Sequence, residues 1–185
     1  MNQTAPSTDT STDTRWVTIT VNGTEQRKQV VPRTHLIDFL RDGLGMRTAR
    51  VGCEHGVCGA CTVRLDGDIV RGCLVLAVQA DGSEVETIDA ASDRGDLSEL
   101  QQAFHAHNAL QCGFCTSGML FTASALLEEQ PDATRAQVRE YMSGNYCRCT
   151  GYHAIVDAIC EVLEARRAAA SSLATPIEET VNGPT

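Results

Sequence analysis

Apolar and polar residues alternate along the first part of the chain with the period of two that is typical of strands. In WVTITV, polar residues separate Val17, Ile19 and Val21, and the Asn22-Gly23 pair that follows is a strong hairpin signal. A second hairpin signal, Asp66-Gly67, lies inside TVRLDGDIV, and EVETI is a further strand candidate. The alternation therefore predicts two hairpins and a last strand before about residue 90.

One short helix interrupts this strand pattern. In HLIDFLRDGLG, Leu36, Phe39 and Leu40 share a helical face, and Gly43 and Gly45 are suited to ending the helix. Strands around one helix make the first half of the chain an α+β unit.

After about residue 90 the apolar positions recur with the period of a helix. Four short helices of this kind would form a small bundle. The helices and their signals are LSELQQAFHAH, with Asp96 as its cap and Glu99 three residues on; SGMLFTASALLEE, with Thr116 as its cap; a helix that opens on the capping box of Thr134 and Gln137; and a last helix with Tyr152, Ile155, Ile159 and Val162 on one stripe.

These patterns divide the chain into four segments. Residues 15–90 form the α+β unit and residues 91–167 form the helical unit. Residues 1–14 and 168–185 lack apolar periodicity and are rich in small and polar residues, so we expect both to be disordered tails.

Composition narrows the functions that this fold could serve. The chain of 185 residues has a formal net charge of -9, which argues against a nucleic-acid or anionic-membrane surface. It contains no apolar run near the ~18 residues that a membrane span needs and no leader pattern, so we expect a cytoplasmic protein. In that compartment nine cysteines favour metal or redox use over disulfides.

Four cysteines lie in the first half, with the sequence CEHGVCGAC followed by RGC. The opening Cys-x4-Cys-x2-Cys with one remote cysteine is the plant-type [2Fe-2S] spacing. Glycines between them allow the backbone to turn sharply and bring N–H groups close to the sulfurs. The spacing predicts an iron-sulfur loop with the ligands Cys53, Cys58, Cys61 and Cys73.

Two other metal sites are less consistent with this loop. Zinc prefers repeated Cys-x2-Cys pairs, and a Rieske centre needs two histidines in place of two thiolates. His55 is the loop's only histidine, so we expect it to lie outside the ligand set or to face solvent.

Four more cysteines lie in the helical half: Cys112 and Cys115 in QCGFCTSGM, and Cys147 and Cys149 in GNYCRCTGY. Each pair lies at a predicted helix boundary, so two loops meeting at one end of the bundle would bring four thiolates together. The spacing alone fits a zinc site as well as an iron-sulfur cluster.

The remaining chemistry-bearing residues suggest no active site. His105 and His107 are two apart on a helix and face different sides, so we expect surface or packing roles. Cys160 lies between Ile159 and Val162 and reads as a buried structural thiol. There is no Gly-rich phosphate loop of the Rossmann or Walker type.

The motifs CEHGVCGACTV, QCGFCTSGM and GNYCRCTGY, in this order, resemble those of the small iron-sulfur subunits of the xanthine oxidase family of molybdenum hydroxylases. The family includes carbon monoxide dehydrogenases and bacterial N-heterocycle and aldehyde dehydrogenases. The resemblance covers about Arg15 to Ala165. One departure is Ser117, where the family commonly has proline, and serine is also acceptable near a helix start.

The resemblance implies a fold and two cofactors. It implies a β-grasp, plant-type ferredoxin-like domain with one [2Fe-2S] cluster, followed by a four-helix-bundle domain with a second [2Fe-2S] cluster. For the second cysteine set, the resemblance thus favours an iron-sulfur cluster over zinc, which the spacing alone left open. In relatives the second cluster lies nearer a molybdopterin-type molybdenum cofactor and the first nearer FAD. Gln111 would then hydrogen-bond the pterin, with Cys149 close to it.

The implied function is electron transfer between partner subunits. A large molybdopterin-binding subunit and a medium FAD-binding subunit would hold the other cofactors, in a dimer of heterotrimers, and this chain would pass electrons from molybdenum to flavin. A free-standing ferredoxin-like carrier or redox regulator is the alternative. The substrate site would lie on another subunit, so we expect no catalytic residue here.

Overall fold

The first hairpin forms as the alternation predicts. In the computed structural model, which describes residues 13–173, β1 (Arg15–Val21) pairs antiparallel with β2 (Thr24–Val30). Asn22 and Gly23 have φ values of 51° and 76°, the positive values that a tight two-residue turn of this kind requires at both positions. The alternate apolar residues of β1 are buried and form one side of the first core.

A five-stranded sheet is built on this hairpin. The remaining strands are β3 (Thr62–Leu65), β4 (Asp68–Arg71) and β5 (Glu84–Glu86), and the order across the sheet is β2-β1-β5-β3-β4. The β3–β4 hairpin confirms the Asp66-Gly67 signal. The pairing of β5 with β1 is parallel and brings distant parts of the chain together, which a local pattern could not show.

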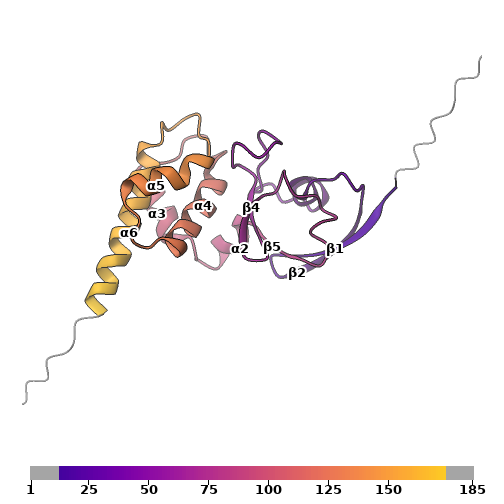
Figure 1. Cartoon of the computed structure of the whole chain (residues 1–185), viewed down its shortest axis with the longest axis horizontal. Coiled ribbons are helices and arrows are strands. Elements are labelled where there is room, and N and C mark those ends of the chain that lie inside the picture. The colour runs from indigo at the N-terminus through magenta and orange to yellow at the C-terminus, as the bar shows by residue number, and fades with distance from the viewer. Residues whose placement is uncertain (1–12, 174–185) are drawn as a thin grey trace, which may run out of the picture.

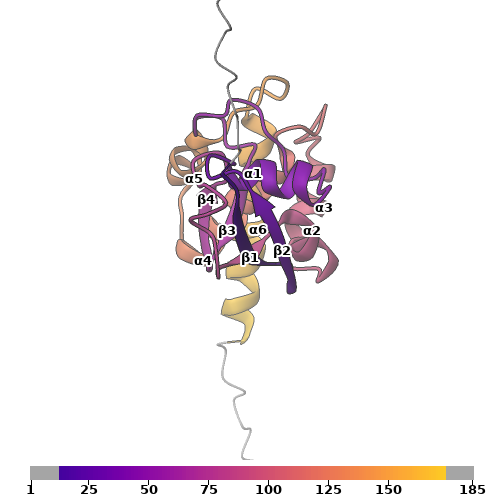
Figure 2. The same cartoon turned by 90° about the vertical axis from the view of Figure 1, so that its right-hand side faces the viewer.

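The predicted helix of the first half is a short α-turn that widens. α1 (Leu36–Asp38) continues into the π-helical η1 (Phe39–Gly43), and both pack across the sheet (Figure 2). Leu36, Phe39 and Leu40 are buried, as their shared face predicts. Gly45, with φ of 77°, supplies the left-handed backbone after this segment.

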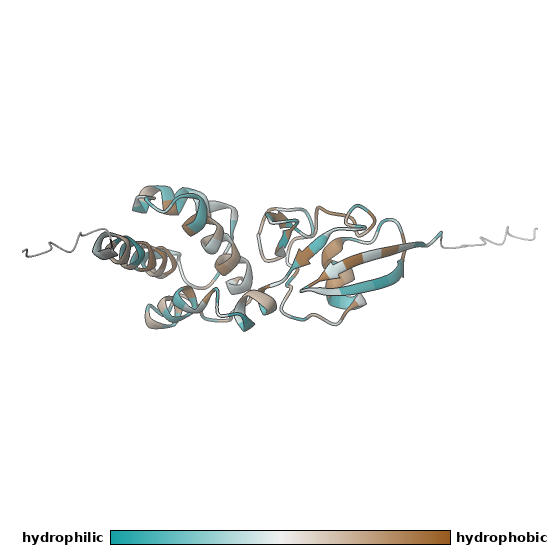
Figure 3. Cartoon of the chain, turned by 90° about the horizontal axis from the view of Figure 1, so that it is seen from below, coloured by the Kyte–Doolittle hydropathy of each residue, from teal (hydrophilic) through white to brown (hydrophobic). Residues whose placement is uncertain are grey.

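The second half is helical and lies beside the sheet along the long axis of the molecule (Figures 1 and 3). α2 is not predicted by the sequence pattern; its six residues are too few for a helical period to show. The protein as described is thus of mixed α+β class. The elements are α2 (Ile88–Asp93), α3 (Ser98–Ala106), α4 (Thr116–Glu129), α5 (Arg135–Tyr141), the 3-10 turn η2 (Met142–Gly144) and α6 (His153–Leu173).

Of the three predicted helix caps, one is confirmed. Thr134 and Gln137 form the reciprocal capping box at the start of α5. Asp96 does not cap α3, because its carboxylate instead accepts from Arg94. Thr116 is the first residue of α4 and not its cap; the preceding position belongs to Cys115, so α4 begins without a side-chain cap.

The last helix also differs from the prediction. Tyr152 lies before α6 with a left-handed φ of 72° and does not share the buried stripe of Ile155, Ile159 and Val162. α6 continues past Arg167 to Leu173, because the alanines there favour a helix even without an apolar stripe. Residues 1–12 and 174–185 of the two predicted tails lie outside the described residues. No helix within residues 13–173 is long and apolar enough to cross a membrane.

Each half has its own hydrophobic core, and the change from one to the other falls between Val85 and Ile88. The two halves meet where α4 packs on β3 and β4. The contact is close, since a Cβ placed on Gly118 of α4 would lie 2.1 Å from the carbonyl oxygen of Gly59. Arg64 of β3 reaches across to Glu128 of α4. This interface fixes the position of the cysteine loops relative to each other.

Candidate metal centres

The first cysteine set gathers in a loop between η1 and β3, and Cys73 joins it from the turn after β4. The sulfurs of Cys61 and Cys73 lie 3.3 Å apart. Backbone N–H groups point at two of the sulfurs: Gly56 donates to Cys73 (3.2 Å) and Cys58 donates to Cys53 (3.4 Å). The four predicted residues therefore do come together, within a frame of N–H donors.

The glycines of this loop are needed for its path. Gly56 and Gly59 have φ values of 84° and 75°, which side chains rarely adopt. A Cβ on Gly56 would lie 2.5 Å from the Leu74 side chain, and one on Gly59 would lie 2.9 Å from the Gly144 carbonyl oxygen. Only glycine fits at these two places.

The environment shifts the pKa values of two of these thiols in opposite directions. Burial opposes ionisation of Cys53, but backbone N–H donors around its sulfur, including that of Cys58, lower its pKa to about 6. Burial, together with the sulfur of Cys73 beside it, raises the pKa of Cys61 to about 12. A cluster binds thiolates, so loading this loop requires the buried Cys61 to lose a proton.

The second set forms where two loops meet at one end of the helices. Cys112 and Cys115 precede α4, while Cys147 and Cys149 lie between η2 and α6. The sulfurs of Cys112 and Cys149 lie 3.6 Å apart. Burial, together with the nearby Cys147 sulfur, raises the pKa of Cys115 to about 12.

Thr150 and Tyr152 hold the loop of Cys147 and Cys149 in place. The Thr150 backbone N–H (3.4 Å) and hydroxyl (3.1 Å) both point at the Cys147 sulfur. The Tyr152 hydroxyl accepts from the backbone N–H of Cys147 at 3.0 Å. The left-handed Tyr152 thus turns its ring back toward the cysteine loop, which explains why it does not join α6.

Gln111 connects the two loops of this second set. Its side-chain Nε2 donates to the carbonyl oxygen of Cys149 at 3.1 Å, and the residue is exposed. The side-chain carbonyl oxygen of Gln111 makes no hydrogen bond within the described part of the chain. Gln111 therefore has an acceptor available at the surface beside Cys112.

The arrangement of sulfurs fits a binuclear cluster. A [2Fe-2S] cluster takes two thiolates on each of two irons. The sulfurs here approach in pairs, Cys61 with Cys73 and Cys112 with Cys149. The donor sets fit two such clusters.

A backbone hydrogen bond joins the two centres. The N–H of Tyr146, next to Cys147, donates to the carbonyl oxygen of Cys58 at 2.8 Å. Beside it, a Cβ on Gly52 would lie 3.6 Å from the Phe114 ring of the second centre. The two cysteine loops are therefore in direct contact.

Asn145 supports that contact from inside the interface and was not singled out from the sequence. It is 1% exposed, and its side-chain oxygen accepts from Arg71 of β4 and from Thr122 of α4, each at 3.1 Å. Arg71 also donates to the carbonyl oxygen of Gly144. An asparagine between a glycine and a tyrosine carries no signal of burial, so the sequence could not reveal this role.

The other residues considered from the sequence lie away from the sulfurs or at their edge. His55 is exposed and its ring contacts the carbonyl oxygen of Cys53, as expected of a residue outside the ligand set. His107 pairs with Glu161 at the surface. Cys160 packs against the helical core, as expected of a structural thiol, but it is partly buried where burial was expected.

Large apolar side chains are exposed around both centres. Val57 and Leu74 are 42% and 62% exposed beside the first, and Leu110 and Phe114 are 39% and 42% exposed beside the second. Exposed apolar residues in groups mark surfaces that bind other proteins. Both centres thus lie under surfaces suited to partners.

Comparisons with known proteins agree with this geometry. Residues 19–98 match the family described as a 2Fe-2S iron-sulfur cluster binding domain, and residues 85–160 match a [2Fe-2S] binding domain. The chain is 52% identical to the 6-hydroxypseudooxynicotine dehydrogenase complex subunit beta of Paenarthrobacter nicotinovorans, over 81% of this chain and 94% of that relative. It is 49% identical to caffeine dehydrogenase subunit gamma of Pseudomonas sp. strain CBB1, over 79% of this chain and 89% of the relative.

A solved structure shows the same likeness. The structure of quinoline 2-oxidoreductase from Pseudomonas putida 86 contains a chain that is 48% identical, with a TM-score of 0.74, over 84% of this chain and 97% of that one. The resemblance inferred from the three motifs is confirmed. The chain belongs to the small iron-sulfur subunits of the xanthine oxidase family of molybdenum hydroxylases, the electron-transfer subunits of multi-subunit oxidoreductases whose catalytic site lies on another subunit.

Proposed function

We propose that this chain relays electrons from a molybdopterin-type molybdenum cofactor on a large partner subunit to FAD on a medium partner subunit. The observation that carries the proposal is the contact between its two sulfur centres. The Tyr146–Cys58 hydrogen bond leaves one non-covalent step in the backbone path between them. The contact keeps the two centres close together, and a short separation favours electron transfer between them.

The proposed ligands follow the pairs of sulfurs. Cys53 and Cys58 would hold one iron of the first cluster, and Cys61 and Cys73 the other. In the second cluster the pairs would be Cys112 with Cys149, and Cys115 with Cys147. Each cluster, when bound, takes up one electron at a time.

We assign the second centre to the molybdenum side. Cys149 and Gln111 lie at the exposed edge of this centre. Because its Nε2 is held by the Cys149 carbonyl, the Gln111 side-chain oxygen is oriented and available to accept from an N–H group of the pterin. The first centre, with Val57 and Leu74 exposed around it, would face the flavin subunit.

This chain's own contribution is distance, burial and hydrogen bonding to sulfur. The N–H groups of Gly56 and Thr150 point at ligand sulfurs, and such donors raise a cluster's potential by stabilising its more negative, reduced form. The close packing of Gly118 on Gly59 fixes the separation of the two loops. No residue of this chain needs to touch the oxidised substrate.

We also propose how the two halves of the chain are divided into domains. Residues 15–90 would be a β-grasp ferredoxin-like domain and residues 91–167 a four-helix-bundle domain, each with one cluster. We place the chain in the cytoplasm, in a dimer of heterotrimers.

Three of the relatives are named for nicotine, caffeine and quinoline, all of which are N-heteroaromatic compounds. An N-heterocycle is therefore the substrate class to test first on the large subunit.

Isolation of the chain from its own cells tests the assembly. We expect molybdenum and FAD to arrive on two larger partners, with about four irons and four sulfides per copy of this chain. Iron on a lone chain would indicate a free-standing carrier instead. Two irons and one zinc would contradict the second cluster.

Cys149→Ser tests the assignment of ligands. The reduced wild-type protein should give two distinct paramagnetic signals, and the variant should lose the one from the second centre and keep the other. Loss of both signals from a protein that remains folded would contradict two independent ligand sets.

A further inference from the structure

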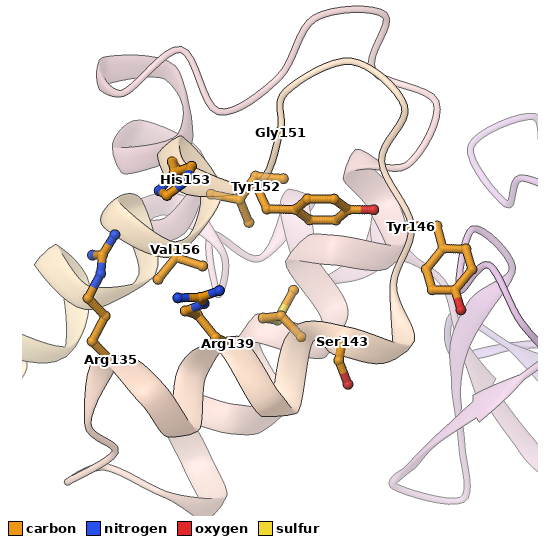
Figure 4. Close-up of a pocket in the computed structure, with 10 residues that line it drawn as sticks. Arg135, Arg139, Ser143, Tyr146, Gly151, Tyr152, His153 and Val156 are labelled. Carbon is orange, nitrogen blue, oxygen red and sulfur yellow. The ribbon is translucent and has the colours of Figure 1, made fainter.

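A pocket of about 260 Å³ opens beside the second centre, between α5, η2 and the start of α6 (Figure 4). Met142, Ile155 and Val156 are buried and form an apolar floor. Polar and aromatic side chains surround it, with exposed residues Arg139, Tyr146, Tyr152 and His153 at the rim. None of these residues belongs to the proposed ligand sets.

The size of the pocket limits what it can hold. Its volume equals that of roughly nine water molecules, at about 30 Å³ each in the liquid. Pockets for drug-sized molecules begin at roughly 300 Å³. A flavin or pterin nucleotide is too large for it, whereas two or three protein side chains fit.

The charge of the rim is positive. Arg135 is already paired with Asp157 at 2.6 Å. Arg139 makes no ion pair or side-chain hydrogen bond within residues 13–173, and its guanidinium is directed into the pocket in Figure 4. No carboxylate among the described residues lines the pocket, although the whole chain has a net charge of -9. An unpaired guanidinium above an apolar floor favours a carboxylate beside an apolar side chain.

The rim is continuous with the frame of the second centre. Tyr152 accepts from the N–H of Cys147, and Tyr146 donates its own N–H to Cys58. The same stretch, from η2 to the start of α6, therefore forms one wall of the pocket and one loop of the centre. A protein that docks against this centre would cover the pocket mouth as well.

We propose that the pocket receives a segment of the large molybdenum-cofactor subunit, with a carboxylate on Arg139 and the neighbouring apolar side chain on the floor formed by Met142, Ile155 and Val156. This rests on the proposed function, which places that subunit against the second centre. The contact adds an anchor for the large subunit away from the cofactor itself.

Cross-linking identifies the occupant directly. A photo-reactive phenylalanine analogue replaces Ser143, an exposed residue of the pocket, in the complex assembled with its partner subunits. Irradiation and peptide mass analysis should locate the cross-link in the large subunit, at a segment with Asp or Glu next to an apolar residue. A cross-link to the flavin subunit or to a second copy of this chain would overturn the proposal.

Two variants measure the contact. Arg139→Glu reverses the charge at the rim, and Ser143→Trp fills the mouth without changing charge. Each should weaken association with the large subunit by roughly tenfold or more. Arg139→Glu would set two like charges against each other, and the Ser143→Trp indole would take the space of the docked segment. Arg33→Glu makes the same charge change on an exposed arginine of the other half and should leave association unchanged.

The readouts separate this proposal from the one that it rests on. Iron content and the two paramagnetic signals of each variant should match the wild type, since both residues are exposed and bind no iron. A wild-type chain that brings no molybdenum subunit with it overturns both proposals. A wild-type complex that both variants form with unchanged affinity overturns the pocket proposal alone.

Discussion

Gly118→Ala probes the interface that holds the two cysteine loops together. Gly118 lies in α4, where a new Cβ would meet the carbonyl oxygen of Gly59 at 2.1 Å. Real Cβ atoms essentially never approach another atom closer than 3.0 Å, and a backbone carbonyl cannot rotate away as a side chain can. Accommodating the methyl group therefore requires the interface to open by roughly 1 Å.

Two opposing effects set the size of the change. Alanine gains about 1 kcal/mol over glycine within a helix. Overpacking a tight contact costs typically about 1–3 kcal/mol, and we take the upper value because the clash is severe. The difference, about 3 minus about 1, is a net loss of about 2 kcal/mol in the free energy of unfolding. In a protein of this size that lowers the midpoint of thermal unfolding by roughly 4–8 °C.

The assay measures two quantities for each variant and for the wild type: the thermal unfolding midpoint of the iron-loaded chain, and the magnetic coupling between its two reduced clusters. Gly118→Ala should lower the midpoint and weaken the coupling, because Gly59 follows Cys58, whose carbonyl oxygen bonds to Tyr146. Gly43→Ala is the matched control, since its Cβ would meet only the Phe39 ring at an ordinary 3.7 Å. If both alanine variants unfold like the wild type with unchanged coupling, the argument from this contact is refuted.

Three further changes test other features of the chain. Ser117→Ala should stabilise the protein by up to about 1 kcal/mol in urea unfolding, because the Ser117 hydroxyl is buried and has no hydrogen bond within the described residues; a lower urea midpoint would count against this. Thr134→Ala should cost about 0.5–2 kcal/mol in the same assay by removing the capping box of α5, and an unchanged midpoint would show that the box contributes nothing. Removal of iron and sulfide should lower the thermal midpoint and reduce helical circular dichroism, since metal–thiolate bonds contribute folding energy; an iron-free chain that melts like the loaded one would contradict it.

The sequence predicts those features that depend on nearby residues. The Asn22-Gly23 turn sets its own hairpin register, and alternation then determines which face of β1 is buried. The capping box at Thr134 works within one turn of helix. Cysteine spacing likewise brings the predicted ligands into two groups, because each loop is short and its glycines permit few paths.

Helix starts are harder to predict because tertiary contacts compete with local signals. Asp96 has the right spacing to cap α3, yet Arg94 takes its carboxylate, and Gly95 with φ of 81° begins the turn instead. Tyr152 has the spacing of a core residue of α6, but its hydroxyl instead accepts from the backbone N–H of Cys147. In both cases a partner outside the predicted helix decides the outcome.

The contact between the centres is the part that sequence reasoning could not reach, and it keeps the two proposed clusters close together. The cysteines specify two metal sites, but the motif GNYC says nothing of what Asn145 and Tyr146 touch. The structure shows that Asn145 is buried between β4 and α4, so that Tyr146 meets Cys58. Asn145 is buried where the two loops meet and binds no metal, so the spacing of the cysteines does not reveal its role. The relay therefore depends on residues that bind no iron, and changes at Asn145 should affect electron transfer between the clusters more than cluster binding itself.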